Sequence, residues 1–412
     1  MTDGWTSWAL YDIAEYQNGR PNRPSELGNT GLPVVRIPEL RRGVDAGTDR
    51  VDVDVEDRHL VRRGDLLFSW SGTIVIAVWQ GPDAVLNQHI FRVKAKPWVD
   101  QRFLRYLLES QVPVFERIVR DQATSMGHVK VADLRRLPAQ LPPIEEQRAI
   151  ASVLGALDDK IELNRRMCET LEALARAIFT SWFVDFDPVR AKAEGRQPVG
   201  MDAETASLFP DSFTDSPLGL IPSGWHVLPL DRLANFLNGL ALQRYPPTGN
   251  GELPVIKIPE LRSGVTGNTG RASTEVPDQY LVADGDVLFS WSGSLVAVLW
   301  SGGVGALNQH LFRVTSGEYP RWLYYLWIGR HMGAFRAIAA GKATTMGHIQ
   351  RVHLSQAQCV VPPTALLDRA TSLLEPMLDA IVNNGTQSRL LATMRDTLLP
   401  KLVSGALRLP PF

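Results

Sequence analysis

Cysteine is scarce in this sequence, and long hydrophobic runs are missing from it. The 412 residues include only two cysteines, Cys168 and Cys359, so a disulfide framework or a cysteine-ligated metal site is excluded. No apolar stretch approaches the roughly 18 residues that a membrane-spanning helix needs. The opening residues, MTDGWTSWALYDIAEY, have neither the basic patch nor the apolar stretch of a signal peptide. We therefore expect a cytoplasmic protein without a membrane segment.

There is also little excess charge of either sign. The formal net charge is -1, and the composition of 44% hydrophobic and 21% charged residues is typical of a globular protein. The near-neutral total removes the simplest sign of a nucleic-acid-binding protein, although it does not describe how charge is distributed over the surface. The length predicts two or more domains, each with its own core.

The sequence does contain one long internal repeat. LPVVRIPELRRGV at 32–44 recurs as LPVIKIPELRSGV at 253–265 with 10 of 13 positions identical, and 60–93 matches 281–314 without a gap at 20 of 34 positions. Both pairs of stretches are 221 residues apart. Since only small loop adjustments separate the copies, each half should be one structural unit used twice, and a pseudo-twofold molecule is the expected product.

Each half is predicted to be β-rich first and helical afterwards. Short apolar runs broken by glycine, such as LLFSWSG and TIVIAVW, predict strands over residues 30–95. A patch with helical spacing follows in each copy: Phe103, Leu104, Leu107 and Leu108 in the first, and Trp322, Leu323, Tyr325 and Leu326 in the second.

A long helix is predicted to close each half. Residues 144–182 contain no proline and one glycine, and they carry a seven-residue repeat that makes a helix roughly 58 Å long. The seam positions are Ile150, Leu157, Asn164, Leu171 and Ile178 on one row, and Leu154, Ile161, Cys168, Ala175 and Trp182 on the other. The second copy keeps this register, but Pro376 and Gly385 predict that its helix is kinked or shorter.

One polar seam position is repeated in both long helices. Asn164 lies almost at the midpoint of the first helix, and Asn384 is its equivalent in the second. If the helices pair antiparallel, these two residues meet near the crossing and fix the helix register, as single buried asparagines do in coiled coils. The alternative is that Asn384-Gly385 marks the end of a helix.

Several of these segments match a known family. LPPIEEQRAIASVLGALDDKIELNRR, continued by SWFVDFDPVRAKAEGRQPVGMDAETASLFPDSF and LGLIPSGW, resembles the central conserved region of the specificity (S) subunit of type I restriction-modification systems. TLLPKLVSGALRL resembles the C-terminal conserved helix of that family, and GDLLFSWSGT and LNQH(I/L)FRV resemble pieces of its target-recognition domains. The resemblance covers essentially the whole chain.

The resemblance implies a DNA-recognition subunit that has no catalytic machinery of its own. In that family two target-recognition domains are held apart by antiparallel helices, each domain reads half of a split DNA site, and the helices dock two methyltransferase subunits. Those subunits bring S-adenosylmethionine and methylate adenine N6, and restriction subunits, where a system has them, bring ATP and Mg. The expected partners are double-stranded DNA, two methyltransferase subunits and such restriction subunits, and no cofactor is expected on this chain.

Repeat and resemblance together predict an α+β fold in which two tandem β-rich target-recognition domains are separated by two long antiparallel, coiled-coil-like helices with pseudo-twofold symmetry. The expected segments are recognition domain 1 at 1–143, the central conserved helix at 144–185, a linker at 186–221, recognition domain 2 at 222–363, and the C-terminal conserved helix at 364–412.

Catalytic motifs are missing from the sequence. An adenine methyltransferase needs an Asn/Asp-Pro-Pro-aromatic tetrad, and the prolyl pairs at 142–143, 246–247 and 362–363 lack the acid or amide. Gly341-Lys342 lacks the earlier glycine of a phosphate-binding loop. The repeated histidines have no His-Glu-x-x-His motif or cysteine cluster beside them. We expect neither a catalytic residue nor a metal site.

The candidate DNA-contacting residues are basic and hydroxyl side chains on repeated loops, with backbone groups beside them. A hydroxyl-rich loop that ends in Gly-His, together with the residues after it, supplies Thr124, Ser125, Gly127, His128 and Lys130 in the first copy and Lys342, Thr344, Thr345, Gly347, His348 and Arg351 in the second. Arg36 and Arg41, with Lys257 and Arg262, lie at the edges of a repeated strand and loop, where they either enter a groove or form framework salt bridges. The basic residues of segment 318–353 either form a positive face for DNA or simply lie on the solvent-exposed face of a helix.

Two further repeated groups have mainly structural interpretations. Asn87-Gln88-His89 and Asn308-Gln309-His310 offer amides that can pair with adenine edges, but hydrogen bonding to neighbouring backbone within a strand-like run is the favoured role. Trp70, Trp79, Trp291 and Trp300 are expected in the core, with stacking on a base as the alternative.

The leading prediction is the specificity subunit of a type I restriction-modification complex. Because similar domains in inverted orientation read similar half-sites on opposite strands, the predicted target is split and nearly palindromic. The alternatives are a self-contained DNA-modifying or DNA-cleaving enzyme, and a scaffold that clamps protein partners without binding DNA.

Overall fold

The computed structural model describes residues 4–121, 127–249, 251–341 and 347–409. Contacts between residues divide the chain into two compact units, Met1–Asp159 with Leu391–Phe412, and Lys160–Leu390. Each unit contains one copy of the repeat, and both long helices contribute residues to both units.

The first copy consists of two sheets and a strand pair, followed by helices. The four-stranded sheet has the order β2-β10-β7-β8, the five-stranded sheet has the order β3-β5-β4-β9-β6, and β1 pairs with β11. The bounds are β1 Thr6–Ala9, β2 Ala14–Asn18, β3 Leu27–Gly28, β4 Leu32–Val35, α1 Ile37–Arg42, β5 Arg50–Val51, β6 Leu60–Val61, β7 Leu66–Ser69, β8 Val75–Val78, β9 Ala84–Leu86, β10 Ile90–Ala95, α2 Gln101–Ser110, α3 Val112–Asp121, α4 Val131–Arg136 and β11 Pro138–Leu141. Helix α2 contains the residues for which helical spacing was predicted, from Phe103 to Leu108.

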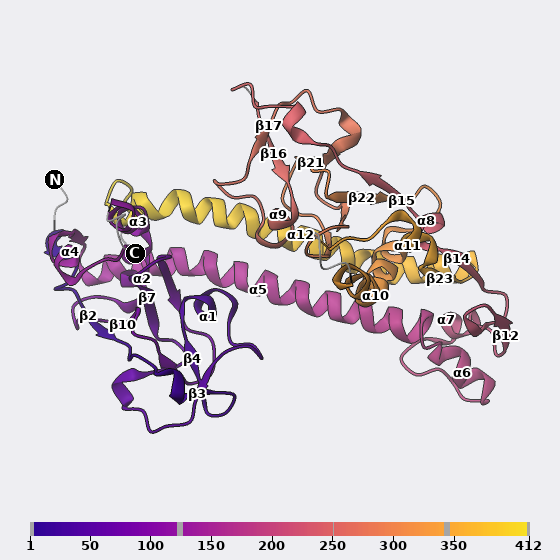
Figure 1. Ribbon diagram of the computed structural model, residues 1–412, viewed down its shortest axis with the longest axis horizontal. Coiled ribbons are helices and arrows are strands. Elements are labelled where there is room, and N and C mark those ends of the chain that lie inside the picture. The colour runs from indigo at the N-terminus through magenta and orange to yellow at the C-terminus, as the bar shows by residue number, and fades with distance from the viewer. Residues whose placement is uncertain (1–3, 122–126, 250, 342–346, 410–412) are drawn as a thin grey trace. The chain divides into compact units, whose positions relative to one another are not determined.

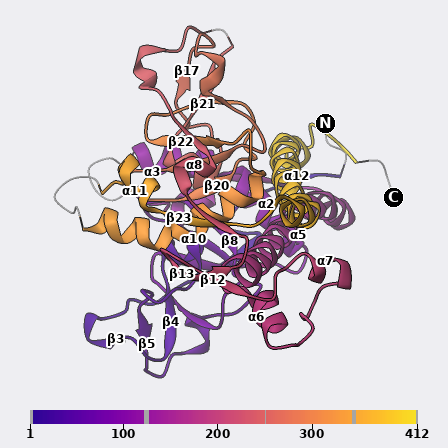
Figure 2. The same cartoon turned by 90° about the vertical axis from the view of Figure 1, so that its right-hand side faces the viewer.

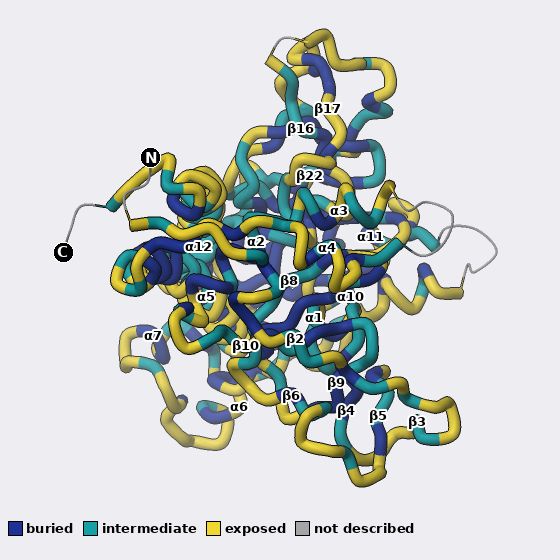
Figure 3. The backbone as a smooth tube through the Cα atoms, turned by 90° about the vertical axis from the view of Figure 1, so that its left-hand side faces the viewer, coloured by how far each residue is buried: buried dark blue, intermediate teal, exposed yellow. Residues whose placement is uncertain are grey.

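Strand β7 lies between two cores, which explains why its sequence has no polar face. Leu66 and Phe68 pack with helices α2 and α5, whereas Leu67 packs with Val35 and Trp79 on the other side. Side chains alternate along a strand, so a run of four buried residues is what a strand covered on both faces requires. Figure 3 shows the buried backbone of β4 and β9 and the exposed backbone around β3.

The second copy repeats this arrangement with sheets β15-β22-β19-β20 and β17-β16-β21-β18 and the pair β14-β23. The bounds are β14 His226–Pro229, α8 Leu230–Leu233, β15 Asn235–Asn238, β16 Leu253–Ile256, α9 Ile258–Ser263, β17 Arg271–Ala272, β18 Leu281–Val282, β19 Val287–Ser290, β20 Ala297–Leu299, β21 Gly305–Leu307, β22 Leu311–Thr315, α10 Arg321–Ala340, α11 Arg351–Gln356 and β23 Gln358–Val361. Figure 2 shows β17 and β21 in the small sheet of this copy. Strand β19 alternates between two cores as β7 does, with Leu288 on one side and Phe289 on the other.

The two long helices, α5 (Ile144–Phe183) and α12 (Thr364–Val403), each span 40 residues (Figure 1). The expectation that the second helix is shorter is therefore wrong, since α12 continues through Pro376 and Gly385. The buried side chains of Leu374 and Leu378 belong to the main core of the second unit, and this packing outweighs the low helix propensity of the two interrupting residues.

Segments of the two helices pair antiparallel inside each unit. In the second unit, Asn164 faces Gln387, and the thiol of Cys168 lies 3.5 Å from the carbonyl of Ile381. In the first unit, Arg395 donates to Asp158 at 2.8 Å, and Leu402 packs into the same core as Leu154.

Residues 186–221 form regular elements within the second unit. These are α6 Asp187–Ala193, α7 Ala203–Ser207, β12 Phe213–Ser216 and β13 Gly219–Pro222. Phe186, Val189 and Phe209 are buried in the main core of this unit, and Arg369 of α12 donates to Asp202 at 2.7 Å. The segment expected to be a linker is thus packed against α12.

Candidate nucleic-acid interface

In the first copy, a partly exposed tryptophan lies between two histidines. The Trp70 ring is 5.5 Å from the ring of His89 and 5.9 Å from that of His128, centroid to centroid. Its indole N–H donates to Oδ1 of Asn18 at 3.1 Å. The backbone N–H of Val129 donates to the carbonyl of Trp70 at 2.8 Å, so the Gly-His segment is attached to the turn that follows β7.

The second copy contains the same cluster. Trp291 lies 5.7 Å from His310 and 6.4 Å from His348, and its indole N–H donates to Asn238 at 2.8 Å. Ser292 Oγ is 2.9 Å from Nδ1 of His310, a contact that adds a hydroxyl to the group. We name Asn18, Trp70, His89 and His128, and their equivalents Asn238, Trp291, His310 and His348, the Trp–His clusters.

Glycine makes the close approaches around the clusters possible. A Cβ on Gly19 would lie 2.2 Å from the Asn87 carbonyl oxygen, and a Cβ on Gly127 would lie 2.1 Å from that of Val119. The equivalents Gly239 and Gly347 would place a Cβ 2.3 Å and 2.6 Å from backbone oxygens. Any side chain at these four positions would force the backbone to move.

The Asn-Gln-His motif forms a turn between two strands. Asn87 Oδ1 accepts a hydrogen bond of 3.2 Å from the backbone N–H of His89, and Asn308 does the same for His310. The predicted hydrogen bond between the asparagine and the backbone is present. The prediction that the motif lies within a strand is wrong, because it forms a turn. Trp79 and Trp300 are buried as predicted, whereas Trp70 and Trp291 are only partly buried because they line the surface clusters.

Two of the four cations expected at the strand and loop edges are N-cap residues of short helices. Arg36 precedes α1 and forms an ion pair with Asp49. Lys257 precedes α9, and its Nζ lies 3.8 Å from the position that a Cβ of Gly270, the equivalent of Asp49, would occupy. In the first copy, Asp49 therefore neutralises Arg36. In the second copy, the equivalent of Asp49 is Gly270, so Lys257 has no acid at that position.

The remaining described candidates differ in their surroundings. Arg41 is exposed on α1, and Arg262 on α9 donates to Ser294. Lys130 is an exposed N-cap of α4. Arg351 donates to the carbonyl of Phe236 at 3.0 Å, so it is held within its own domain.

Two arginines of the basic segment 318–353 have partners within the second unit. Arg321 forms ion pairs with Glu375 and Asp379, and Arg336 donates to the carbonyl of Leu295. Most of α10 is buried, which the basic residues alone did not indicate. Five candidate residues, Thr124, Ser125, Lys342, Thr344 and Thr345, lie outside the described residues.

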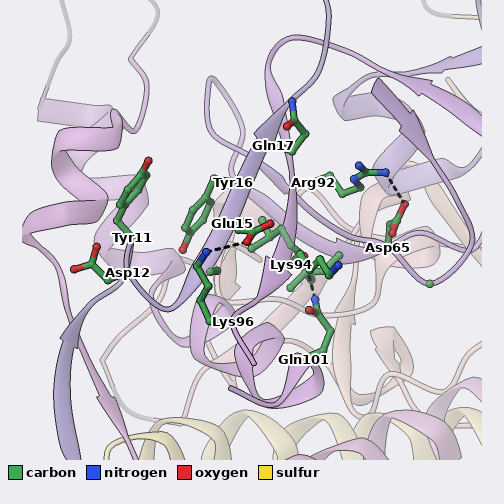
Figure 4. Close-up of a pocket in the computed structure, with 14 residues that line it drawn as sticks. Tyr11, Asp12, Glu15, Tyr16, Gln17, Asp65, Arg92, Lys94, Lys96 and Gln101 are labelled. Atoms are coloured by element: carbon green, nitrogen blue, oxygen red, sulfur yellow. Dashed lines mark hydrogen bonds and ion pairs between the residues drawn. The ribbon is translucent and has the colours of Figure 1, made fainter. Parts of the chain in front are cut away.

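A hollow of about 860 Å³ in the first unit is formed beside β2 and β10 (Figure 4). Its charged side chains are largely paired with one another: Lys96 donates to Glu15 at 2.8 Å, and Arg92 lies 3.9 Å from Asp65. The hollow contains none of the predicted site residues, and its mixed charge gives a phosphate little attraction.

Metal-binding groups and the two cysteines were the remaining chemical candidates among the described residues. No group of three or more His, Cys, Asp or Glu side chains able to hold a metal ion occurs among them. Burial raises the pKa of the Cys359 thiol, and burial is also the main cause of the raised pKa of Cys168, so neither cysteine is an activated thiolate. Within the same part of the chain, no helix is long and apolar enough to cross a membrane.

The structure brings together groups that were considered separately in the sequence. Gly-His, Trp-Ser-Gly and Asn-Gln-His converge in each copy, and the clusters as defined contain none of the described basic candidates. Asn18 and Asn238 were missed, although the repeat contained a signal for them, since each precedes a glycine at equivalent positions of the two copies.

The comparisons with known proteins concern the same family that the sequence motifs resemble. The model of the type I restriction modification DNA specificity domain matches residues 2–173. The chain is 26% identical over 348 residues to the type I restriction enzyme MjaIX specificity subunit of Methanocaldococcus jannaschii, covering 81% of this chain and 75% of that one. It is 23% identical to the HindI specificity subunit of Haemophilus influenzae, covering 74% and 76% of the two chains.

A solved structure has a similar fold. The crystal structure of a type I restriction-modification S subunit from M. genitalium matches with a TM-score of 0.56 and 14% identity, covering 99% of this chain and 96% of that chain. The matched relatives are specificity subunits, which confirms the predicted resemblance to the specificity subunits of type I restriction-modification systems.

Proposed function

The chain is related to the specificity subunits of type I restriction-modification systems, and on this basis we propose that it reads a bipartite DNA site for such a complex. Each recognition domain, 1–143 and 222–363, reads one half of the site. The conserved helices at 144–185 and 364–412 hold the domains apart in a pseudo-twofold arrangement and dock two adenine-N6 methyltransferase subunits. The segment at 186–221 joins the two halves, and the complex acts in the cytoplasm.

The observation that carries this proposal is the presence of the same Trp–His cluster in both copies. Each cluster combines a partly exposed indole, imidazole nitrogens and amide groups, which are groups that contact bases and phosphates in protein–DNA complexes. Two equivalent clusters on two similar domains match a site with two similar halves.

The other candidates supply contacts to the phosphates of the DNA. Lys257 and Arg41 offer exposed cations, whereas Arg36 offers one that is already paired with Asp49. The hydroxyl-rich loops before His128 and His348 add backbone and hydroxyl donors. Asn164 and Asn384 fix the register of the helices.

A methylation map tests the proposal. The chain is co-expressed with the methyltransferase encoded beside it, and modified adenines are mapped across a genome. The expected result is a split, nearly palindromic motif that disappears when this chain is omitted. Two unrelated half-sites would show that the repeated residues are framework only.

The alternative of a self-contained enzyme makes a different prediction. Methylation or cleavage of DNA by the isolated chain would contradict the proposed function. Absence of salt-dependent, sequence-selective DNA binding in the presence of the methyltransferase would favour the protein scaffold instead.

A further inference from the structure

The second copy is attached to α12 by a group of contacts around Gly385. A Cβ on Gly385 would lie 2.3 Å from Oγ of Ser301, so only glycine lets the loop after β20 come this close to the helix. Arg389, one turn further along α12, donates from Nε to the carbonyl of Ser301 at 3.2 Å. The helix therefore provides both the space and the donor for one loop of the recognition domain.

Asp284 is the centre of these contacts. Its carboxylate accepts hydrogen bonds from Nη2 of Arg389 at 3.1 Å, from the hydroxyl of Thr386 at 3.2 Å and from the backbone N–H of Gly303 at 2.6 Å. Gly303 has a φ of 83°, a conformation that a glycine adopts without strain. We name Asp284, Ser301, Gly303, Gly385, Thr386 and Arg389 the clasp.

A second level of contacts joins the same domain to α12 nearer the start of the helix. Arg321 forms an ion pair of 2.7 Å with Glu375, and the indole of Trp322 donates to Thr371 at 2.9 Å. At 1.5 Å per residue, Glu375 and Arg389 are roughly 21 Å apart along the helix. The domain also packs on α12 through the core that contains Leu374 and Leu378, and the clasp adds an attachment at one end of that contact, where it resists tilting of the domain.

The first copy shares one ion pair of this second level but not the residues of the clasp. In the first unit, Arg102 of α2 lies 3.4 Å from Asp159, the equivalent of Asp379. The positions equivalent to Gly385, Asp284 and Arg389 are Arg165, Arg63 and Glu169, so the glycine is replaced and the signs of the two charges are exchanged. Any function of the clasp therefore belongs to the second recognition domain.

We propose that the clasp fixes the orientation of the second recognition domain on α12 and thereby sets the spacer length that the complex accepts between the two DNA half-sites. This inference rests on the proposed function. A tilt of about 10° moves a point roughly 20 Å from the pivot by ~3.4 Å, which is one base-pair step along the DNA. The clasp residues are positioning residues, since they act through the domain that they hold.

The test uses the full chain with its methyltransferase and the variant Arg389→Gln. A library of sites whose spacer is one base pair shorter or longer is methylated and sequenced. Methylation at the altered spacers, relative to the native spacer, is expected to rise about tenfold, equivalent to ~1.4 kcal/mol. Arg196→Gln, which removes an exposed arginine paired with Glu194, is the matched control and should leave spacer selectivity unchanged.

A second variant and a second measurement distinguish a failure of the clasp from a failure of its role in spacing. Gly385→Ala should relax the spacer in the same direction, and hydrogen exchange of peptides that contain Gly303 should accelerate in both variants. Unchanged exchange would overturn the clasp itself. Faster exchange with an unchanged spacer would overturn its role in spacing while leaving the proposed function intact. A wild-type complex that methylates no bipartite site would instead remove the proposed function.

Discussion

The side-chain amide of Asn164 donates a hydrogen bond of 2.8 Å to Oε1 of Gln387, and Asn164 has no exposed surface. The same amide lies 3.4 Å from the backbone carbonyl of Asn384, whereas the buried Oδ1 of Asn164 has no partner among the described residues. The two asparagines do come together, but through the backbone of one of them, with Gln387 as the side-chain partner. A buried amide that is only half satisfied costs free energy, and its benefit is specificity of pairing.

Replacing Asn164 by leucine should therefore raise the melting temperature of the chain, because an apolar side chain removes the unsatisfied oxygen. The gain should be about 1 kcal/mol in the free energy of unfolding. Uniform pairing should be lost at the same time, which cross-linking of the helices and native mass spectrometry of the methyltransferase complex would detect. Asn383→Leu, on the exposed face of α12, is the control. A destabilised variant with unchanged stoichiometry would contradict the expectation.

Asp158 should make stability depend on acid pH. Burial acts to raise the pKa of its carboxyl, but the hydrogen bond from Arg395 and the charge of Arg105 outweigh it, and the net pKa is lowered from 3.8. A lowered pKa in the folded state contributes stability above the unfolded value, and this contribution is lost as pH falls through the folded value. Asp158→Asn should cost about 2 kcal/mol at neutral pH and show a smaller loss of stability below pH 4 in urea titrations. Asp396→Asn, whose carboxylate is mostly exposed, should change neither.

Gly127 and Gly347 should resist substitution by alanine. A Cβ would meet a backbone oxygen at 2.1 Å and 2.6 Å respectively, so the segment that carries His128 or His348 has to move away from the cluster. Each variant should lose about 1–3 kcal/mol of stability, with the larger loss for Gly127→Ala. Gly267→Ala is the control, because nothing lies within 4 Å of its added Cβ. Equal melting temperatures for all three variants would show that the loops adapt freely.

Asp49 and Lys257 should affect the salt dependence of DNA binding in opposite directions. Lys257→Gln should reduce the slope of log K against log salt by about 1, since one phosphate contact is lost. Asp49→Asn should increase it by up to about 1 by releasing Arg36 from its ion pair. Fluorescence anisotropy of the methyltransferase complex at several salt concentrations measures both, with Arg196→Gln as the control. Unchanged slopes would place both cations outside the DNA interface.

Features that depend on residues close together in the sequence were predicted correctly, whereas features that depend on contacts between distant residues were not. The helical patches, the long helix from residue 144 and the repeat were visible because each produces a regular pattern along the chain. Pro376 and Gly385 predict a kinked or shorter α12 by local propensity, but the helix is not shorter, because buried residues such as Leu374 and Leu378 stabilise it through packing. Composition did not show that Arg321 and Arg336 of the basic segment have partners within their own unit.

Residue patterns alone established that the chain contains two copies of one half, that each half ends in a long helix, and that the methyltransferase tetrad and the phosphate-binding loop are missing. Those features depend on periodicity and on residue types at short spacing. Only the tertiary structure decided that Trp70 lies between His89 and His128, that Asp49 neutralises Arg36 while Gly270 leaves Lys257 without an acid at that position, and that Gly385 admits the loop containing Ser301. These contacts join residues far apart in the chain, and packing of the folded backbone is what brings them together.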